Sequence, residues 1–142
     1  MTVEMADIRA GLATNLKTVS GSRQVLAYPT DNQLPPTLLV VGFDRIVRTG
    51  FGNPGSGRGS FEIPFLIQGI AGKPTVKSAH IVLDRWLSPF ASENVWGAIE
   101  SDRTLGGKVS SLSVVECDGY QEILLPGGVY MLGSTWHVNI EL

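Results

Sequence analysis

The sequence has few of the residues that make cross-links, membrane spans or strongly charged surfaces. Its 142 residues include one cysteine, Cys117, so no disulfide bond can form within the chain. No run approaches the roughly 20 apolar residues that a membrane-spanning helix needs. The amino-terminal segment carries Glu4, Asp7 and Arg9 within its apolar pattern, which argues against a signal peptide. We therefore expect a protein made and kept in an aqueous compartment.

Charge is also scarce, since 17% of the residues are charged and the net charge is −2. This composition argues against a protein whose main task is to grip a nucleic-acid backbone, because that task needs a concentrated basic face. It fits a surface that other subunits partly cover, since the cores of interfaces are depleted in charge. The length predicts a single domain over residues 1–142, large enough to bury a core without disulfides or metals.

Hydrophobic spacing predicts three helices. The first begins after a cap at Thr2 and has one apolar face, made by Met5, Ile8, Leu12 and Leu16. The second begins at about Thr75, after Pro74, and ends at Leu87. A third, shorter helix is expected to begin after a cap at Ser92 and to end near Ser101.

Six segments have the apolar patterns of strands: 23–28, 37–47, 61–69, 109–116, 120–125 and 129–142. Pro64 predicts an edge strand or a bulge within the third of them, because proline cannot donate a hydrogen bond. The strands fall in two runs and the helices are grouped. This order predicts an α+β fold, with a mixed, largely antiparallel sheet of about six strands and helices packed on one face.

The most unusual stretch is 49–60, in which five of twelve residues are glycine. A phosphate-binding loop would lead into a helix, whereas this stretch leads into a strand, so nucleotide binding is not expected. The pattern instead predicts the flexible tip of a long β-hairpin arm. Two interpretations stay open: a plain surface loop, or an arm that orders when it contacts a neighbouring subunit or lines a lumen. The candidate contact residues are Arg45, Arg48, Phe51 and Arg58.

Catalytic and metal-binding patterns are not evident. His80 and His137 have no further ligand at the spacing that metal sites use, so we predict no metal site and no cofactor. Cys117 follows a predicted strand rather than opening a helix, which favours a structural thiol over a nucleophile. We expect no catalytic residues, and hence not an enzyme.

The order of several segments resembles the tail terminator proteins of long-tailed bacteriophages (siphoviruses) of actinobacteria. The most specific are LDRWLSP at 83–89 and VWGAIESDRTLGG at 95–107. They are accompanied by MADIRAGLA at 5–13, by Tyr28-Pro29 with a proline-rich turn, and by YMLG at 130–133. The resemblance extends over nearly the whole chain.

The resemblance implies a structural virion protein with a mixed α/β fold and no catalytic residues. Such proteins form a homo-oligomeric, hexameric ring that ends the tail tube and binds the neck or head-completion protein. Genomic DNA passes through the lumen of the ring without sequence-specific binding. The resemblance thus places the protein at the tail–neck junction of the virion, after synthesis in the host cytoplasm.

Two alternatives remain at this stage. Another head–tail connector or a tail-tube protein would have a similar size and plan. A small enzyme or ligand-binding domain would instead need a pocket with convergent polar groups.

Overall fold

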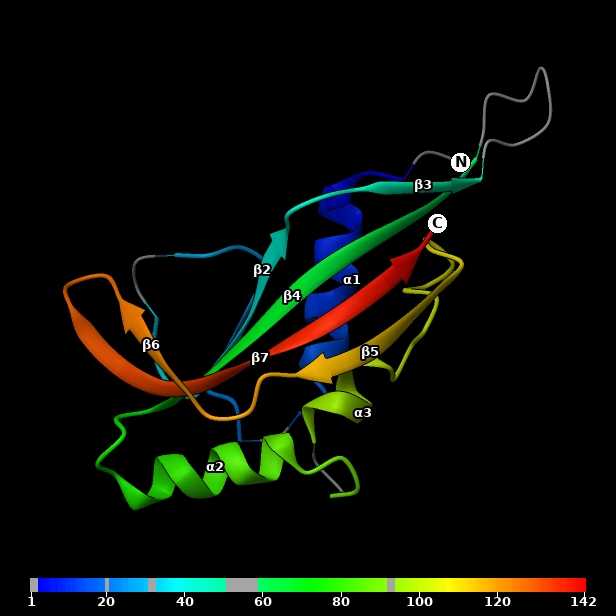
Figure 1. The fold of residues 1–142 in the computed structure, drawn as a ribbon. Coiled ribbons are helices and arrows are strands. Elements are labelled where there is room, and N and C mark those ends of the chain that lie inside the picture. The colour runs from blue at the N-terminus through cyan, green and yellow to red at the C-terminus, as the bar shows by residue number, and fades with distance from the viewer. Residues whose placement is uncertain (1–2, 20, 31–32, 51–58, 92–93) are drawn as a thin grey trace.

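The computed structural model describes residues 3–19, 21–30, 33–50, 59–91 and 94–142 (Figure 1). Among them are three helices and seven strands, which confirms the predicted α+β class. In chain order they are α1 (Met5–Leu16), β1 (Gln24–Leu26), β2 (Thr37–Phe43), β3 (Val47–Gly50), β4 (Ser60–Gly72), α2 (Lys77–Leu87), α3 (Val95–Ile99), β5 (Ser111–Cys117), β6 (Gln121–Leu125) and β7 (Val129–Glu141). None of the helices in these residues is long and apolar enough to cross a bilayer.

The strands form one sheet in the order β1-β2-β4-β7-β5, with β3 also paired to β4 and β6 also paired to β7. Only the β1–β2 pair is parallel among the described strands, so the prediction of a mixed, largely antiparallel sheet is confirmed. The centre of the sheet is the long antiparallel pair of β4 and β7, which runs from Glu62↔Glu141 to Gly72↔Leu132.

The sheet has one strand more than expected, because the predicted strand 37–47 ends early and a separate short strand, β3, overlaps it only at Val47. The ladder between β2 and β4 contains a bulge between Val40 and Gly42, and β2 ends at Phe43. The chain then crosses an exposed loop and pairs again with β4 as β3. The apolar pattern continues across this break, so hydrophobicity alone did not reveal it.

Pro64 does not mark an edge strand, since β4 has neighbours on both sides. On one side Pro64 pairs with Asn139 of β7. On the other side, pairing with β2 stops at Phe65 and pairing with β3 begins at Glu62. Pro64 therefore lies opposite the loop between β2 and β3, where its missing N–H breaks no ladder hydrogen bond on that side.

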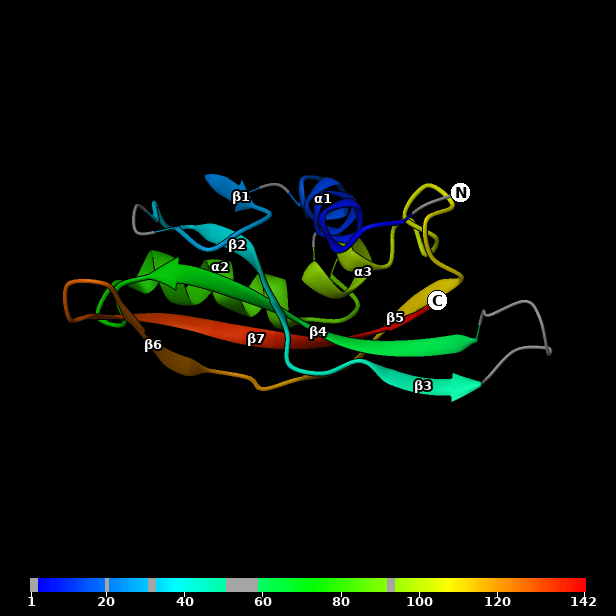
Figure 2. The same ribbon diagram turned by 90° about the horizontal axis from the view of Figure 1, so that it is seen from above.

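The three helices lie on one side of the sheet, as predicted (Figure 2). Alternation along the two central strands supplies the buried side of the sheet, made by Ile63, Phe65 and Ile67 of β4 and by Trp136, Val138 and Ile140 of β7. The helices cover it with apolar stripes formed by Ile8, Leu12, Leu16, Ala79, Leu83 and Trp86. Each of the larger side chains contributes about 1.5–3 kcal/mol through burial.

The helices begin later than predicted. The N-cap of α1 is Glu4, whose backbone N–H donates to the Asp7 carboxylate (3.0 Å) in a capping box. The N-cap of α3 is Asn94, whose Oδ1 accepts from the backbone N–H of Gly97 (2.6 Å). The N-cap of α2 is Val76, which makes no side-chain cap. The predicted caps Thr2 and Ser92 lie outside the described residues.

One arginine fastens α1 to the sheet. The guanidinium of Arg9 donates to the backbone carbonyls of Ala27 (2.9 Å), Val40 (3.0 Å) and Val41 (3.1 Å). Its Cζ lies 4.6 Å from the centre of the Tyr28 ring. Helix α1 is thus held to β2 and to the segment that follows β1 by polar contacts as well as by its apolar stripe.

The turn after α3 docks on α1. Buried Asn15 donates to the carbonyls of Ile99 (2.9 Å) and Asp102 (3.1 Å). The Asp102 carboxylate accepts from the backbone N–H groups of Thr104 (3.2 Å) and Gly106 (2.9 Å). These bonds shape a turn that holds Leu105 buried at a positive φ of 50°.

We expect Asp102→Ala to lower the melting temperature by a few degrees near neutral pH, because the turn loses its acceptor. The backbone hydrogen bonds of Thr104 and Gly106 lower the pKa of the Asp102 carboxyl from its usual 3.8. The ionised carboxylate therefore stabilises the fold above that value, and this stability is lost as the pH falls through the lowered pKa. Thermal melts at several pH values should show the difference from wild type shrinking in acid, whereas Asp44→Ala, at an exposed loop position, should match wild type throughout.

Candidate functional site

The base of the predicted hairpin arm is present in the structure. Strands β3 and β4 pair antiparallel up to Gly50↔Ser60. Of the four predicted contact residues, Arg45 is exposed in the loop before β3. Arg48 lies on β3 with its Cζ 5.6 Å from the centre of the Phe61 ring, so it contacts the returning strand of its own hairpin. Phe51 and Arg58, with most of the predicted tip 49–60, lie outside the described residues.

Exposed apolar side chains occur at several places on the surface, and two groups of them lie at the ends of the sheet. At the β3 end they are Phe43, Ile46 and Val47, and at the β6–β7 end they are Leu124, Val129 and Tyr130. Figure 1 shows β3 and the turn between β6 and β7 at opposite ends of the sheet. We call these two groups the β3 end and the β6 end.

Each of these ends also has an unpaired strand edge among the described residues. Strand β3 pairs only with β4. Strand β6 pairs only with β7, along the edge of β7 opposite to the one that pairs with β4. Free edges with apolar side chains are surfaces on which another chain can add a strand. The two edges differ in sequence.

The central part of the side of the sheet opposite the helices is largely polar and carries acidic residues, and we call it the open face. Its positions follow from the register and the alternation of the central strands: Glu62, Pro64, Leu66 and Gln68 on β4, Ser113 and Glu116 on β5, and Thr135, His137, Asn139 and Glu141 on β7. They include three glutamates and no lysine or arginine. Because Glu62 and Glu141 are direct partners in the ladder, like charges face each other there.

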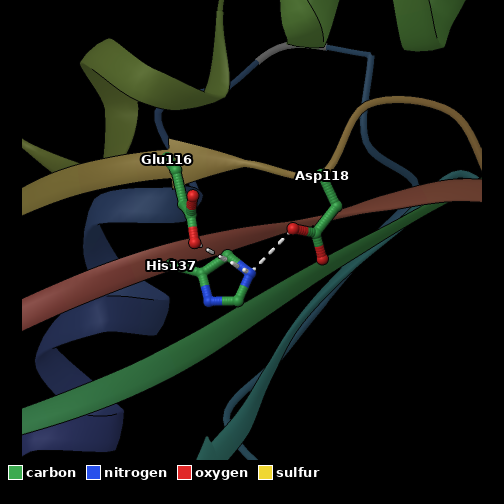
Figure 3. A group of neighbouring side chains, drawn as sticks. All are labelled: Glu116, Asp118 and His137. Carbon is green, nitrogen blue, oxygen red and sulfur yellow. Dashed lines mark hydrogen bonds and ion pairs between the residues drawn. The ribbon is translucent and has the colours of Figure 1, made fainter.

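One group on the open face brings three ligand-type side chains together: Glu116, Asp118 and His137 (Figure 3). Nε2 of His137 lies 2.9 Å from Oδ1 of Asp118 and 4.0 Å from Oε1 of Glu116. One ligand atom from each residue lies within 4.8 Å of the others. Both carboxylates therefore approach Nε2 of His137, one from the end of β5 and the other from the residue directly after it.

Strand geometry explains this convergence. A bulge between Val114 and Glu116 shifts the register of β5, so that Glu116 is the partner of His137. The chain then leaves β5, and the backbone N–H of Asp118 donates to the carbonyl of Thr135 on β7 (3.0 Å). Glu116 and Asp118 thus approach His137 from the same side of β7.

The carboxylate of Asp118 is also oriented by its neighbours. The hydroxyl of Thr135 donates to Oε1 of Gln121 (2.9 Å), and Nε2 of Gln121 donates to Oδ2 of Asp118 (3.2 Å). These bonds leave Oδ1 of Asp118 directed at His137. Asp118 and His137 are thereby joined by a hydrogen bond, and Asp118 is also held to β7 through Gln121 and Thr135.

The prediction of no metal site rested on sequence spacing, whereas the structure brings Glu116 and Asp118 next to His137 from another part of the chain. These neighbours come from a different strand, so no short sequence spacing could reveal them. The only available signal was the pairing of two acidic residues, Glu116 and Asp118, around a predicted turn next to the strand of His137. The other histidine, His80, lies on α2, where its Nε2 contacts the carbonyl of Pro74 (2.7 Å).

The thiol of Cys117 faces away from this group, although it lies between Glu116 and Asp118 in the sequence. In the register it is the partner of buried Trp136, and its Sγ lies 3.1 Å from Oγ of Ser134. The thiol is half-buried against the core. Cys117 and His137 therefore do not form a nucleophile–base pair.

Comparison with known proteins finds no family model that matches the chain and no curated protein with a significant match.

Proposed function

We propose that this protein is a structural virion protein that forms a ring at the end of a phage tail tube. The ring joins the tube to the neck or head-completion complex, and DNA passes through its lumen. The proposal rests on the sequence resemblance to tail terminators together with one feature of the surface, the two unlike ends of the sheet.

The two ends support a head-to-tail assembly. A symmetric dimer needs one surface that complements itself, whereas a ring needs two different surfaces that complement each other. The β3 end and the β6 end differ in their residues, lie at opposite ends of the sheet, and carry exposed apolar side chains. In the proposed ring, the β3 end of one copy contacts the β6 end of the next.

The acidic open face is compatible with DNA moving past the protein. Phosphates are repelled by carboxylates, so DNA does not adhere to such a surface. The sequence-independent passage of DNA through the lumen needs no base-specific contact.

The ring interface is tested by damaging each end separately. Val47 is 40% exposed at the β3 end and Leu124 is 56% exposed at the β6 end, so Val47→Glu and Leu124→Glu should leave the fold intact. By light scattering, the wild type should form a ring-sized particle and each variant a monomer. An equal mixture should form dimers, because only one undamaged interface remains. A wild-type dimer, or a mixture of monomers, would argue against a head-to-tail ring.

The place in the virion is tested by imaging particles that contain a labelled copy. Label in a single layer between head and tube supports the proposal. Label along the whole tube would indicate a tail-tube protein instead. Absence from virions would return attention to an enzyme or ligand-binding domain.

Replacing residues 51–59 by an Asn-Gly turn is expected to leave a folded domain but to block the joining of heads and tails. The turn fits because Gly50 and Ser60 are paired in the ladder. Circular dichroism and the melting temperature should match wild type, whereas electron microscopy should show separate heads and tails. Normal virions from this variant would show that the arm has no role in assembly.

A further inference from the structure

We propose that Glu116, Asp118 and His137 form a binding site for one divalent transition-metal ion, with Zn²⁺ as the best-suited probe. The inference does not depend on the ring proposal. It starts from the arrangement in Figure 3, in which two carboxylates converge on one imidazole nitrogen.

Hydrogen bonding alone leaves this arrangement incomplete. A neutral imidazole nitrogen can make one hydrogen bond, and Asp118 at 2.9 Å makes it. Glu116 stays at 4.0 Å from the same nitrogen. Within the described residues, neither carboxylate is paired with a lysine or arginine. Two carboxylates therefore converge on one imidazole nitrogen that can form a hydrogen bond with only one of them.

A metal ion would satisfy all three groups. Bonds from zinc to nitrogen and carboxylate oxygen are about 2.0–2.2 Å, so neighbouring ligand atoms lie about 3 Å apart. The pair of Asp118 and His137 already has this separation. The carboxylate of Glu116 has to approach by roughly an ångström, which its 68% exposed side chain allows. The tautomer with its proton on Nδ1 presents the Nε2 lone pair to the ion.

The ligand set also selects the kind of ion. Imidazole favours zinc and other transition metals over Mg²⁺ and Ca²⁺, which prefer all-oxygen sites. Three protein ligands on a solvent-accessible face leave further coordination positions open to water. Gln121, held by Thr135, orients the Asp118 carboxylate from behind, as residues outside the coordination sphere do in other metal sites.

Bound metal would cross-link the end of β5 to β7. Since the ion binds the folded arrangement and not the unfolded chain, it should raise the melting temperature. We expect a rise of several degrees at saturating Zn²⁺ and none with Mg²⁺ at the same concentration.

Titration calorimetry with Zn²⁺, on protein without a histidine tag, tests the site directly. Wild type should bind one ion per chain, and His137→Ala should weaken binding by roughly 100-fold or more. Asp118→Asn keeps the shape of the side chain and should also weaken binding, while Gln121→Ala should weaken it by about tenfold. The absorption spectrum of the Co²⁺-loaded protein should change in His137→Ala.

Two control variants exclude the other ligands of the chain. His80→Ala removes the only other histidine, and Cys117→Ser removes the only thiol. Both should bind Zn²⁺ as wild type does. The proposal is overturned if wild type shows no saturable binding, if His137→Ala binds equally well, or if Cys117→Ser loses the ion.

Discussion

Replacing Gly69 by valine should destabilise the protein by about 3 kcal/mol, because the substitution overpacks a core position between two indole rings. A Cβ on Gly69 would lie 2.9 Å from Cζ3 of Trp136 and 3.1 Å from Cε3 of Trp86. Both tryptophans are buried, one on β7 and the other on α2, so neither ring has space to withdraw. The glycine is therefore what allows α2 to approach the sheet closely.

Urea unfolding followed by tryptophan fluorescence measures this effect as a change in the free energy of unfolding. Gly50→Val is the matched control, because a Cβ there has the Ser60 hydroxyl as its nearest neighbour at 3.4 Å. The control should change stability by less than about 0.5 kcal/mol. Equal stability of the two variants would show that the indole rings can move apart.

Replacing Arg9 by methionine should destabilise the protein by about 2–3 kcal/mol. Methionine can fill the same space but leaves three carbonyls, those of Ala27, Val40 and Val41, without their donor. The site is built closely around the guanidinium. Gly42 has a φ of +139°, and a Cβ there would lie 2.7 Å from Nη2 of Arg9.

Arg9→Lys should have an intermediate effect, since an ammonium group keeps the charge but cannot reach all three carbonyls in the plane of a guanidinium. Arg103→Met is the control. Arg103 has a 63% exposed side chain and a 3.6 Å ion pair with Glu100, so its loss should cost less than about 0.5 kcal/mol. Chemical unfolding of the three variants compares them directly, and an Arg9→Met protein as stable as Arg103→Met would contradict the role given to Arg9.

Elements with strong periodicity could be predicted from the sequence, because burial on one face leaves a regular pattern. The alternation that ends in Trp136, Val138 and Ile140 predicted β7, and the helical spacing of Ala79 and Leu83 predicted α2. The split between β2 and β3 could not be predicted, since Phe43, Ile46 and Val47 continue the apolar pattern across the loop. The path of the loop there depends on which residues of β4 pair with β2 and which pair with β3.

The metal site proposed here escaped prediction for a related reason. The contact of Glu116 with His137 depends on the register between β5 and β7, and a bulge after Val114 sets that register. A shift by one residue would turn Glu116 to the other face of the sheet. Register of this kind is a property of the folded sheet and leaves no local mark in the sequence.

The position of β7 has a consequence for synthesis on the ribosome. Its partners β4, β5 and β6 all precede it in the chain, and Ile63 pairs with Ile140 more than half the sequence away. The two halves of the sheet therefore cannot join until β7 has left the exit tunnel. Until then β4 exposes one long edge and its apolar side chains, which are features that promote aggregation of a nascent chain.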